Sequence, residues 1–264
     1  MNDSDLSGTG TTGGQGAAIA NEELRVYALA LKLQAIAFYL PPSEPFVASL
    51  LGDDLLAEWP LAPDYPATRR GLQLLHNALG GGEPPALLTV LRADYTALFV
   101  GVDHVTAPPW ESVYLSRDHL LFDTQTLEVR AFYARFGLQI PKLDREPDDH
   151  IGFELLFLSH LMEQAAQALE HDDASAADYL LAAAQDFVQA HPRRWVDLFA
   201  ARVDRHARSD YYRGWAQLLL GSLAALPAIL GSGSDHWKNR PPRSGLKSMT
   251  ITWRGARVIC SVLT

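Results

Sequence analysis

The chain alternates between apolar stripes at helical spacing and short segments marked by proline or glycine. In residues 22–39 an apolar side chain recurs every three or four positions, which is typical of an amphipathic helix: Leu24, Ala28, Leu31, Ala35 and Phe38. Pro41 and Pro42 predict the end of this helix, because proline lacks the amide hydrogen that a helix interior needs.

Eight further segments carry a helical pattern, and we expect a helix in each: 44–59, 66–79, 84–100, 123–138, 150–170, 174–191, 193–207 and 210–230. The expected buried stripe of 123–138 is Leu127, Ala131, Ala134 and Leu138, and that of 150–170 is Ile151, Leu155, Leu158, Met162, Ala165 and Leu169. Asp148 or Asp149 would cap the start of the latter helix. Residues 21–230 show no convincing strand alternation, so we predict an all-α fold, a single globular bundle of about nine helices.

The two ends differ from this body, and they divide the chain into three parts. Residues 1–20 are rich in glycine and threonine and are expected to form a disordered lead-in to the helical domain, residues 21–230. Residues 231–264 begin like a linker and then alternate like a weak hairpin. The origin of this tail stays open, and it takes no part in the predicted fold.

Composition indicates a cytoplasmic globular protein. Of the 264 residues 48% are hydrophobic, yet no uninterrupted apolar run reaches the length of a membrane span, and the first 20 residues do not resemble a signal peptide. The single cysteine, Cys260, excludes an intramolecular disulfide. The tail carries a net charge of +5 and the rest of the chain −14, which would repel nucleic acid and favour a basic partner.

The motifs for cofactors and metals are weak. Residues 8–13 spell G-x-G-x-x-G, but no strand precedes them to deliver backbone amides to a pyrophosphate. His150 with Glu154, and His160 with Gln164, each share a helix face without forming a clustered metal motif. We therefore expect neither a cofactor nor a metal.

One enzymatic alternative stays open, a small hydrolase using Ser112, His150 and Asp149. These residue types could form a nucleophile, a base and an orienting acid if the fold brought them together. No G-x-S-x-G turn presents Ser112, however, so we expect no catalytic residues.

Two irregular stretches are accompanied by aromatic residues, which an ordinary surface loop does not require. Residues 95–99, "YTALF", lead into 107–115, "APPWESVYL", where prolines stand beside an indole. A rigid aromatic loop over a helix end could form one wall of a peptide groove. The acidic stretch 144–150, "DREPDDH", could place carboxylates at its rim.

These stretches resemble a known family. "YTALFVG", "APPWESVYL" and "EPDDHIGFELLFLSHL" are similar to three signature stretches of the TorD/DmsD/NarJ redox-enzyme maturation chaperones, and "PPWESVYL" is closer to the TorD/DmsD branch. The resemblance covers about residues 22–230. It implies an all-helical, non-enzymatic cytoplasmic protein that binds the twin-arginine signal peptide and the apo form of a molybdenum-cofactor oxidoreductase. Such a chaperone would hold its client back from the Tat translocase until the cofactor is inserted.

The resemblance also implies the residues that line the signal-peptide site: Tyr95, Leu98, Phe99, Pro109, Trp110, Ser112, Pro147, Asp149 and His150. Apolar members would bury the hydrophobic part of the peptide, and Asp149, with Glu111 or Asp148 at the rim, would meet its guanidinium groups. His150 would orient Asp149 or gate the site by protonation, or would simply be a residue at a helix N-terminus.

Three further points follow from the resemblance or stay open beside it. Some relatives form domain-swapped dimers, so the chain would be a monomer or such a homodimer, with 139–149 as the hinge. Guanine-nucleotide binding has been attached to the family, but no phosphate-cradling loop supports it here. A helical protein-binding scaffold without a connection to Tat export is the remaining alternative.

Overall fold

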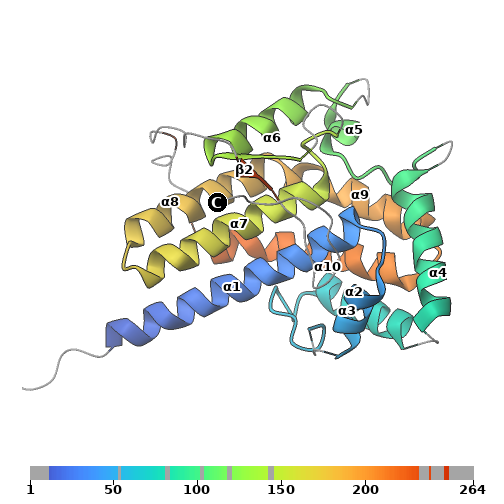
Figure 1. The fold of residues 1–264 in the computed structure, drawn as a ribbon, viewed down its shortest axis with the longest axis horizontal. Helices are drawn as coiled ribbons and strands as arrows, with labels where there is room; N and C mark the ends of the chain where they lie inside the picture. The colour runs from blue at the N-terminus through green and yellow to red at the C-terminus, as the bar shows by residue number, and fades with distance from the viewer. Residues whose placement is uncertain are drawn as a thin grey trace, which may run out of the picture.

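The computed structural model describes residues 12–52, 55–80, 84–101, 104–117, 121–141, 146–231, 238 and 247–249. These residues form ten α-helices, one π-helical turn and two short strands (Figure 1). The helices are α1 Thr12–Tyr39, α2 Glu44–Gly52, α3 Pro66–Leu79, α4 Pro84–Tyr95, α5 Glu111–Leu115, α6 Thr124–Arg135, α7 Ile151–Glu170, α8 Ala174–Ala190, α9 Pro192–His206 and α10 Asp210–Leu230. The π-helical turn η1 is Thr96–Val100, and the strands are β1 Leu138–Gln139 and β2 Lys247–Ser248. The predicted all-α class is confirmed.

Two layers of long helices enclose the core. In one layer α1 lies along α7 and α7 along α8, and behind them α10 packs on α3, α9 and α8 (Figure 1). The predicted stripe of α1 is fully buried, as is that of α7 except for the half-buried Leu169. Helix α10 is long and apolar enough to span a membrane by composition, but 56% of its apolar window is buried in the fold. Its packing is that of a core helix.

Glycine permits the close contact of α3 with α10. A Cβ atom added to Gly214 would lie 2.7 Å from Cγ of Leu75 and 2.9 Å from the carbonyl oxygen of Gly71. Real Cβ atoms do not approach backbone oxygen so closely, so larger residues here would push the two helices apart.

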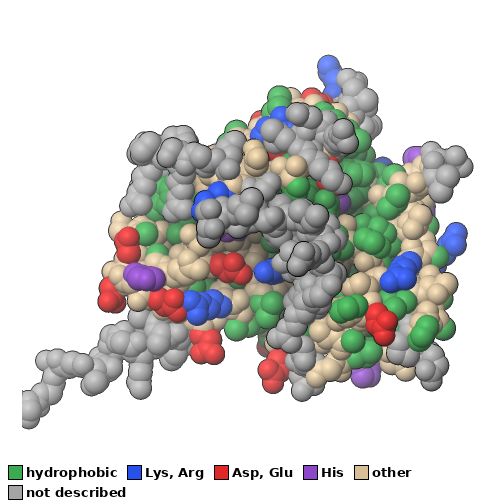
Figure 2. Space-filling model, in the orientation of Figure 1, with side chains coloured by type: hydrophobic (Ala, Val, Ile, Leu, Met, Phe, Trp, Pro, Cys, Tyr) green, Lys and Arg blue, Asp and Glu red, His purple; other side chains and the backbone are tan. Residues whose placement is uncertain are grey.

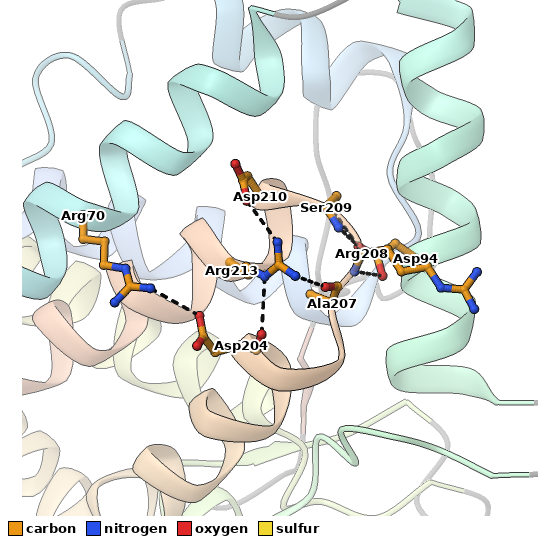
Figure 3. A network of polar contacts seen from close by, with 8 residues as sticks. All are labelled: Arg70, Asp94, Asp204, Ala207, Arg208, Ser209, Asp210 and Arg213. Atoms are coloured by element: carbon orange, nitrogen blue, oxygen red, sulfur yellow. Dashed lines mark hydrogen bonds and ion pairs between the residues drawn. The ribbon is translucent and has the colours of Figure 1, made fainter.

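A carboxylate fixes α4 to the start of α10 (Figure 3). Asp94, which is buried, accepts hydrogen bonds from the backbone amides of Arg208 and Ser209 and from the Ser209 hydroxyl, at 2.6–3.2 Å. These amides precede the first turn of α10, where an acceptor is most favourable. Because Asp94 directly precedes Tyr95, this contact also holds the first signature stretch in place.

Several helix boundaries differ from the predicted ones. Helix α1 begins at Thr12, within the expected disordered lead-in, while residues 1–11 lie outside the described part. Helix α2 ends at Gly52 and gives way to turns at 55–58. The stretch expected to be a loop around Ser112 contains a short helix, α5. Of the predicted tail hairpin only Met249 is described, and of the predicted hinge only 139–141 and 146–149.

The predicted buried face of α6 is largely wrong. Leu127 is 58% exposed, whereas Thr126, Val129 and Tyr133 are buried. The helix turns a threonine inward because that hydroxyl hydrogen-bonds to a buried carboxylate, Asp149. A pattern of apolar residues cannot detect such a face, since one of its members is polar.

Candidate functional site

The second and third signature stretches are joined by a short backbone bridge. Trp110 and His150 pair in antiparallel fashion: the amide of Glu111 donates to the carbonyl of Asp149 at 3.0 Å, and that of Ile151 to Pro109 at 2.8 Å. The sequence-predicted residues Pro109, Trp110, Asp149 and His150 are therefore brought together although 39 positions separate Trp110 from Asp149.

Asp149 secures this bridge from the inside. Its side chain is fully buried and accepts two hydrogen bonds of 2.7 Å, from the amide of Ser112 and from the hydroxyl of Thr126. The first of these bonds satisfies an amide in the first turn of α5, and the second ties α6 to the same carboxylate. Asp149 is thus occupied by protein donors from two elements.

The first signature stretch lies in the core and contacts the start of the proline-rich loop. Leu98 and Phe99 are buried, and the Phe99 ring packs edge-on against Phe38 and Tyr212. The carbonyl of Leu98 accepts a hydrogen bond from the amide of Ala107. Leu98 and Phe99 therefore belong to the core and hold the start of the proline-rich loop.

Tyr95 connects this stretch to the end of α1. Its hydroxyl donates to the carbonyl of Tyr39 at 2.6 Å. Burial raises the pKa of Tyr95 well above its ordinary value, and the nearby Glu146 raises it further, so the hydroxyl remains a donor. Tyr95 is a supporting residue that is 8% exposed.

Four residues form what we call the Trp110 cluster: Tyr39, Trp110, Glu146 and His150. The His150 ring lies between the rings of Tyr39 and Trp110, with centroid distances of 5.2 and 5.6 Å and edge-on geometry in both cases. The hydroxyl of Tyr39 donates to Oε2 of Glu146 at 2.9 Å. His150 is buried, whereas the other three are partly exposed. The cluster therefore presents two aromatic rings and one carboxylate to the surface.

The expected acidic rim of Glu111 and Asp148 is not where the sequence placed it, because both side chains are buried. Oε2 of Glu111 lies 2.9 Å from Nδ1 of His191, and Asp148, next to the buried Pro147, forms an ion pair with Arg130 at 2.8 Å. Desolvation raises the pKa of Asp148, and Arg130 opposes that shift. The accessible carboxylate of the third stretch is Glu146.

His150, and neither Asp148 nor Asp149, caps helix α7. Its Nδ1 accepts a hydrogen bond of 2.9 Å from the amide of Gly152, so the ring does not orient Asp149 through this nitrogen. Burial lowers the pKa of His150 to about 3, and the ring is neutral at physiological pH. Gating by protonation near neutral pH, one of the roles expected for His150, is therefore not supported.

A His150→Asn protein is expected to lose less stability in acid than the unaltered chain. In the unfolded chain His150 binds a proton near pH 6.5, whereas in the folded chain it binds one only near pH 3. The free energy of unfolding therefore decreases as the pH falls through this window. The difference amounts to about 2 kcal/mol between pH 7 and pH 5. Asparagine keeps a capping acceptor but does not titrate. Urea unfolding at both pH values tests this, and equal losses would contradict it.

Two buried carboxyl groups, Glu111 of α5 and Glu154 of α7, lie close together. Glu154, on the first turn of α7, is fully buried close to Glu111. Desolvation raises the pKa of Glu154 well above its ordinary value, and the charges of Glu111 and Asp149 raise it further. Glu154 is therefore protonated when its neighbours are ionised, which limits the charge that the interior must hold.

Glu154→Gln is expected to gain stability relative to the unaltered chain as the pH rises. A group with a raised pKa in the folded state stabilises fully below its unfolded value of 4.5, and this contribution is lost as the pH rises through the folded value. Glutamine has nearly the same shape as glutamic acid, and its amide side chain does not ionise in this pH range. Denaturation curves at pH 5 and pH 8 should show a stability difference that favours the variant only at the higher pH. A difference independent of pH would show that Glu154 is ionised in the fold.

The hydrolase geometry is not assembled within the described residues. The amide of Ser112, not its hydroxyl, contacts Asp149, and the buried Oγ of Ser112 has no hydrogen-bond partner in the part of the chain that the structure describes. Nδ1 of His150 is used by Gly152. Among those same residues no group of three His, Cys, Asp or Glu side chains could hold a metal ion.

Several residues that build the site escaped the sequence analysis: Tyr39, Thr126, Arg130, Glu146 and His191. Tyr39 ends a helix whose C-terminal end was predicted correctly, but only the fold brings that end to His150. Glu146 lay within the acidic stretch, and exposure alone distinguishes it from Asp148 and Asp149.

Comparison with known proteins identifies the family of the chain. Residues 62–201 match the family model described as nitrate reductase delta subunit, which is more than half of the chain. The Tat proofreading chaperone DmsD of Salmonella typhimurium strain LT2 is 30% identical over 201 residues, covering 75% of this chain and 87% of its own.

Two other relatives carry the name chaperone as well. Chaperone protein YcdY of Escherichia coli K12 is 28% identical over 203 residues, with 75% of this chain and 92% of its own covered. Chaperone protein TorD of Vibrio parahaemolyticus is 29% identical over 130 residues, with 49% and 59% covered. These relatives are named as chaperones and not as enzymes. The chain therefore belongs to the TorD/DmsD/NarJ family of redox-enzyme maturation chaperones, on its DmsD/TorD side.

Proposed function

We propose that this chain binds the twin-arginine signal peptide of a molybdenum-cofactor oxidoreductase at the Trp110 cluster, and holds the apo form of that enzyme in the cytoplasm until its cofactor is inserted. The observation that carries the proposal is the convergence of all three signature stretches on this cluster. Tyr95 supports Tyr39, Pro109 and Trp110 bridge to His150, and Glu146 precedes Pro147.

An apolar surface next to the cluster suits the hydrophobic part of such a peptide. Figure 2 shows hydrophobic side chains gathered on the face between α4 and the C-terminal end of α1. Val100, at the end of η1, is 55% exposed, and Leu40 and Val105 are half-buried. The Trp110 side chain is half-buried, so part of its indole ring can contact an apolar side chain of a peptide. Proline rigidity at Pro108 and Pro109 would lower the entropy cost of presenting this ring.

Glu146 is the natural partner for a guanidinium group of the peptide. Asp148 and Asp149 are fully buried, whereas Glu146, which accepts a hydrogen bond from the Tyr39 hydroxyl, is only half-buried. A carboxylate can accept two parallel hydrogen bonds from one arginine. In this proposal Asp149, Ser112, Pro109 and Pro147 shape the loops, while Leu98, Phe99 and Tyr95 support them, and direct contact falls to Tyr39, Trp110 and Glu146.

Glu146→Gln is expected to reduce the affinity for a twin-arginine leader about fivefold and to weaken its dependence on salt. The substitution preserves the acceptor for the Tyr39 hydroxyl and removes only the charge. Calorimetric titration of the full chain at two salt concentrations measures both effects. Glu58 lines a pocket with Val26 and Leu29 of α1, and no residue of the cluster lines that pocket, so Glu58→Gln is the charge-matched control. Equal losses in the two variants would mean that only the net charge of the chain, −9, attracts the peptide.

A further inference from the structure

The C-terminal tail supplies a strand to the body. Strand β2 pairs in parallel with β1, in the register Leu138 to Lys247 and Gln139 to Ser248 (Figure 1). The amide of Lys247 donates to the carbonyl of Gly137 at 2.6 Å, and that of Met249 to Gln139 at 2.7 Å. Both donors belong to the tail and both acceptors to the body, so the pairing is strand addition at an open edge.

One side chain anchors the added strand. Met249 is 3% exposed and joins the apolar core, as do Leu138 of β1 and Ile140, which follows β1. Lys247, two positions earlier, is exposed. Backbone hydrogen bonds together with one buried side chain are the usual means by which an extended peptide is held at a sheet edge.

The tail makes a second contact at Lys238, which lies closer along the chain to the end of α10 than β2 does. The Lys238 ammonium forms an ion pair with Asp186 of α8 at 3.0 Å, and its carbonyl accepts a hydrogen bond from Arg135 of α6. Charge favours the ion pair, because the tail carries +5 and the rest of the chain −14. The tail is thus held at two separate points, one polar and one through the strand.

We propose that the edge of β1 is a docking site for an extended peptide with basic residues and an apolar anchor, and that the chain's own tail around Met249 is its built-in, displaceable occupant. Two paired residues and one methionine make a small contact, and such a strand remains bound because its tether keeps the local concentration high, on the order of millimolar. A competing peptide that offers a longer strand would replace it.

Strand β1 is connected along the chain to the third signature stretch. Gly137, with φ of +73°, ends α6 and turns the chain into β1, a conformation that favours glycine. The chain then passes through Ile140 and Pro141 toward Glu146 and Pro147. Docking on β1 therefore fixes one end of the segment that carries the third signature stretch. Docking of a peptide on β1 does not depend on which client the Trp110 cluster binds. An experiment that contradicts one proposal therefore leaves the other standing.

The test is binding in trans of a labelled synthetic peptide with the sequence of residues 243–252 to the full chain. Met249→Asp should release the tail by placing a charge in an apolar site, so this variant should bind the peptide at least tenfold more tightly than the unaltered chain. Met249→Leu should keep the tail docked and resemble the unaltered chain. Equal binding by all three proteins, or no binding by Met249→Asp while its helical circular dichroism and melting temperature are retained, would overturn the proposal.

A pair of proline variants tests the strand geometry itself. Lys247→Pro removes an amide that bonds to β1. Ser248→Pro removes the amide between the two donors Lys247 and Met249, which the alternation of a strand directs away from β1. Hydrogen exchange at the Met249 amide should be slow in the unaltered chain and in Ser248→Pro, and at least tenfold faster in Lys247→Pro. Fast exchange in the unaltered chain would overturn the docking. Protection that increases with protein concentration would instead assign the strand to a second copy and overturn the intramolecular occupant.

Discussion

A Trp110→Ala protein is expected to bind a twin-arginine leader at least tenfold more weakly than the unaltered chain. The indole is partly exposed at the surface of the Trp110 cluster, and it contacts the ring of His150 edge-on. Burial of such a ring against an apolar peptide contributes on the order of 1–2 kcal/mol, and tenfold in affinity corresponds to about 1.4 kcal/mol. Calorimetry with the purified full chain measures the change directly.

Two controls separate loss of contact from loss of structure. Trp110→Phe keeps an aromatic ring and should retain most of the affinity, but not the indole N–H. Leu198→Ala, on α9, removes an apolar side chain that is 54% exposed and makes no part of the cluster. It should bind like the unaltered chain. If Trp110→Ala binds with unchanged affinity, Trp110 is not part of the peptide site.

Asp149→Ala is expected to destabilise the fold by about 3 kcal/mol or more, the largest stability effect that we predict for the signature stretches. The substitution leaves the amide of Ser112 and the hydroxyl of Thr126 without their acceptor in a buried environment. For a chain of this size each kcal/mol lowers the melting temperature by about 2–4 °C, so a decrease of roughly 6–12 °C follows. Thermal unfolding followed by circular dichroism tests it.

The same variant distinguishes a structural role of Asp149 from direct contact with the peptide. If Asp149 acts by holding α5 and α6 together, Asp149→Asn should recover part of the stability, because its carbonyl oxygen can still accept one hydrogen bond. If Asp149 instead met a guanidinium group, Asp149→Ala would leave the melting temperature unchanged and abolish the preference for arginine over lysine in the leader. That result would contradict the burial of this carboxylate.

The helices of the fold could be predicted well because their apolar stripes coincide with their buried faces. Leu24, Leu31 and Phe38 of α1 are cases in point, and the ends of α3 at Pro66 and Leu79 were predicted to the residue. Helix α6 was different, since Thr126 is buried for its hydrogen bond and Leu127 is left at the surface. Prediction failed where a polar contact, and not hydrophobic burial, decided the orientation.

The candidate site could be located from the sequence, but the task of each residue could not. Spacing along the chain does not show that Asp149 points inward to Ser112 while Glu146 stays accessible beside Tyr39. Both are carboxylates of one acidic stretch, and only packing separates them. The tail is a similar case, since Lys247 lies in the stretch that was predicted to be a linker, and the structure pairs it with β1.

The central claim is that the chain recognises the paired arginines of a leader peptide. Calorimetric titration of the full chain with a synthetic twin-arginine leader, and with the same leader carrying two lysines, tests it most directly. Lysine keeps the charge but cannot form the bidentate contact with a carboxylate. We predict that the arginine leader binds at least tenfold more tightly than the lysine form, and that a scrambled leader does not bind. Equal affinity for all three peptides would contradict the proposed function.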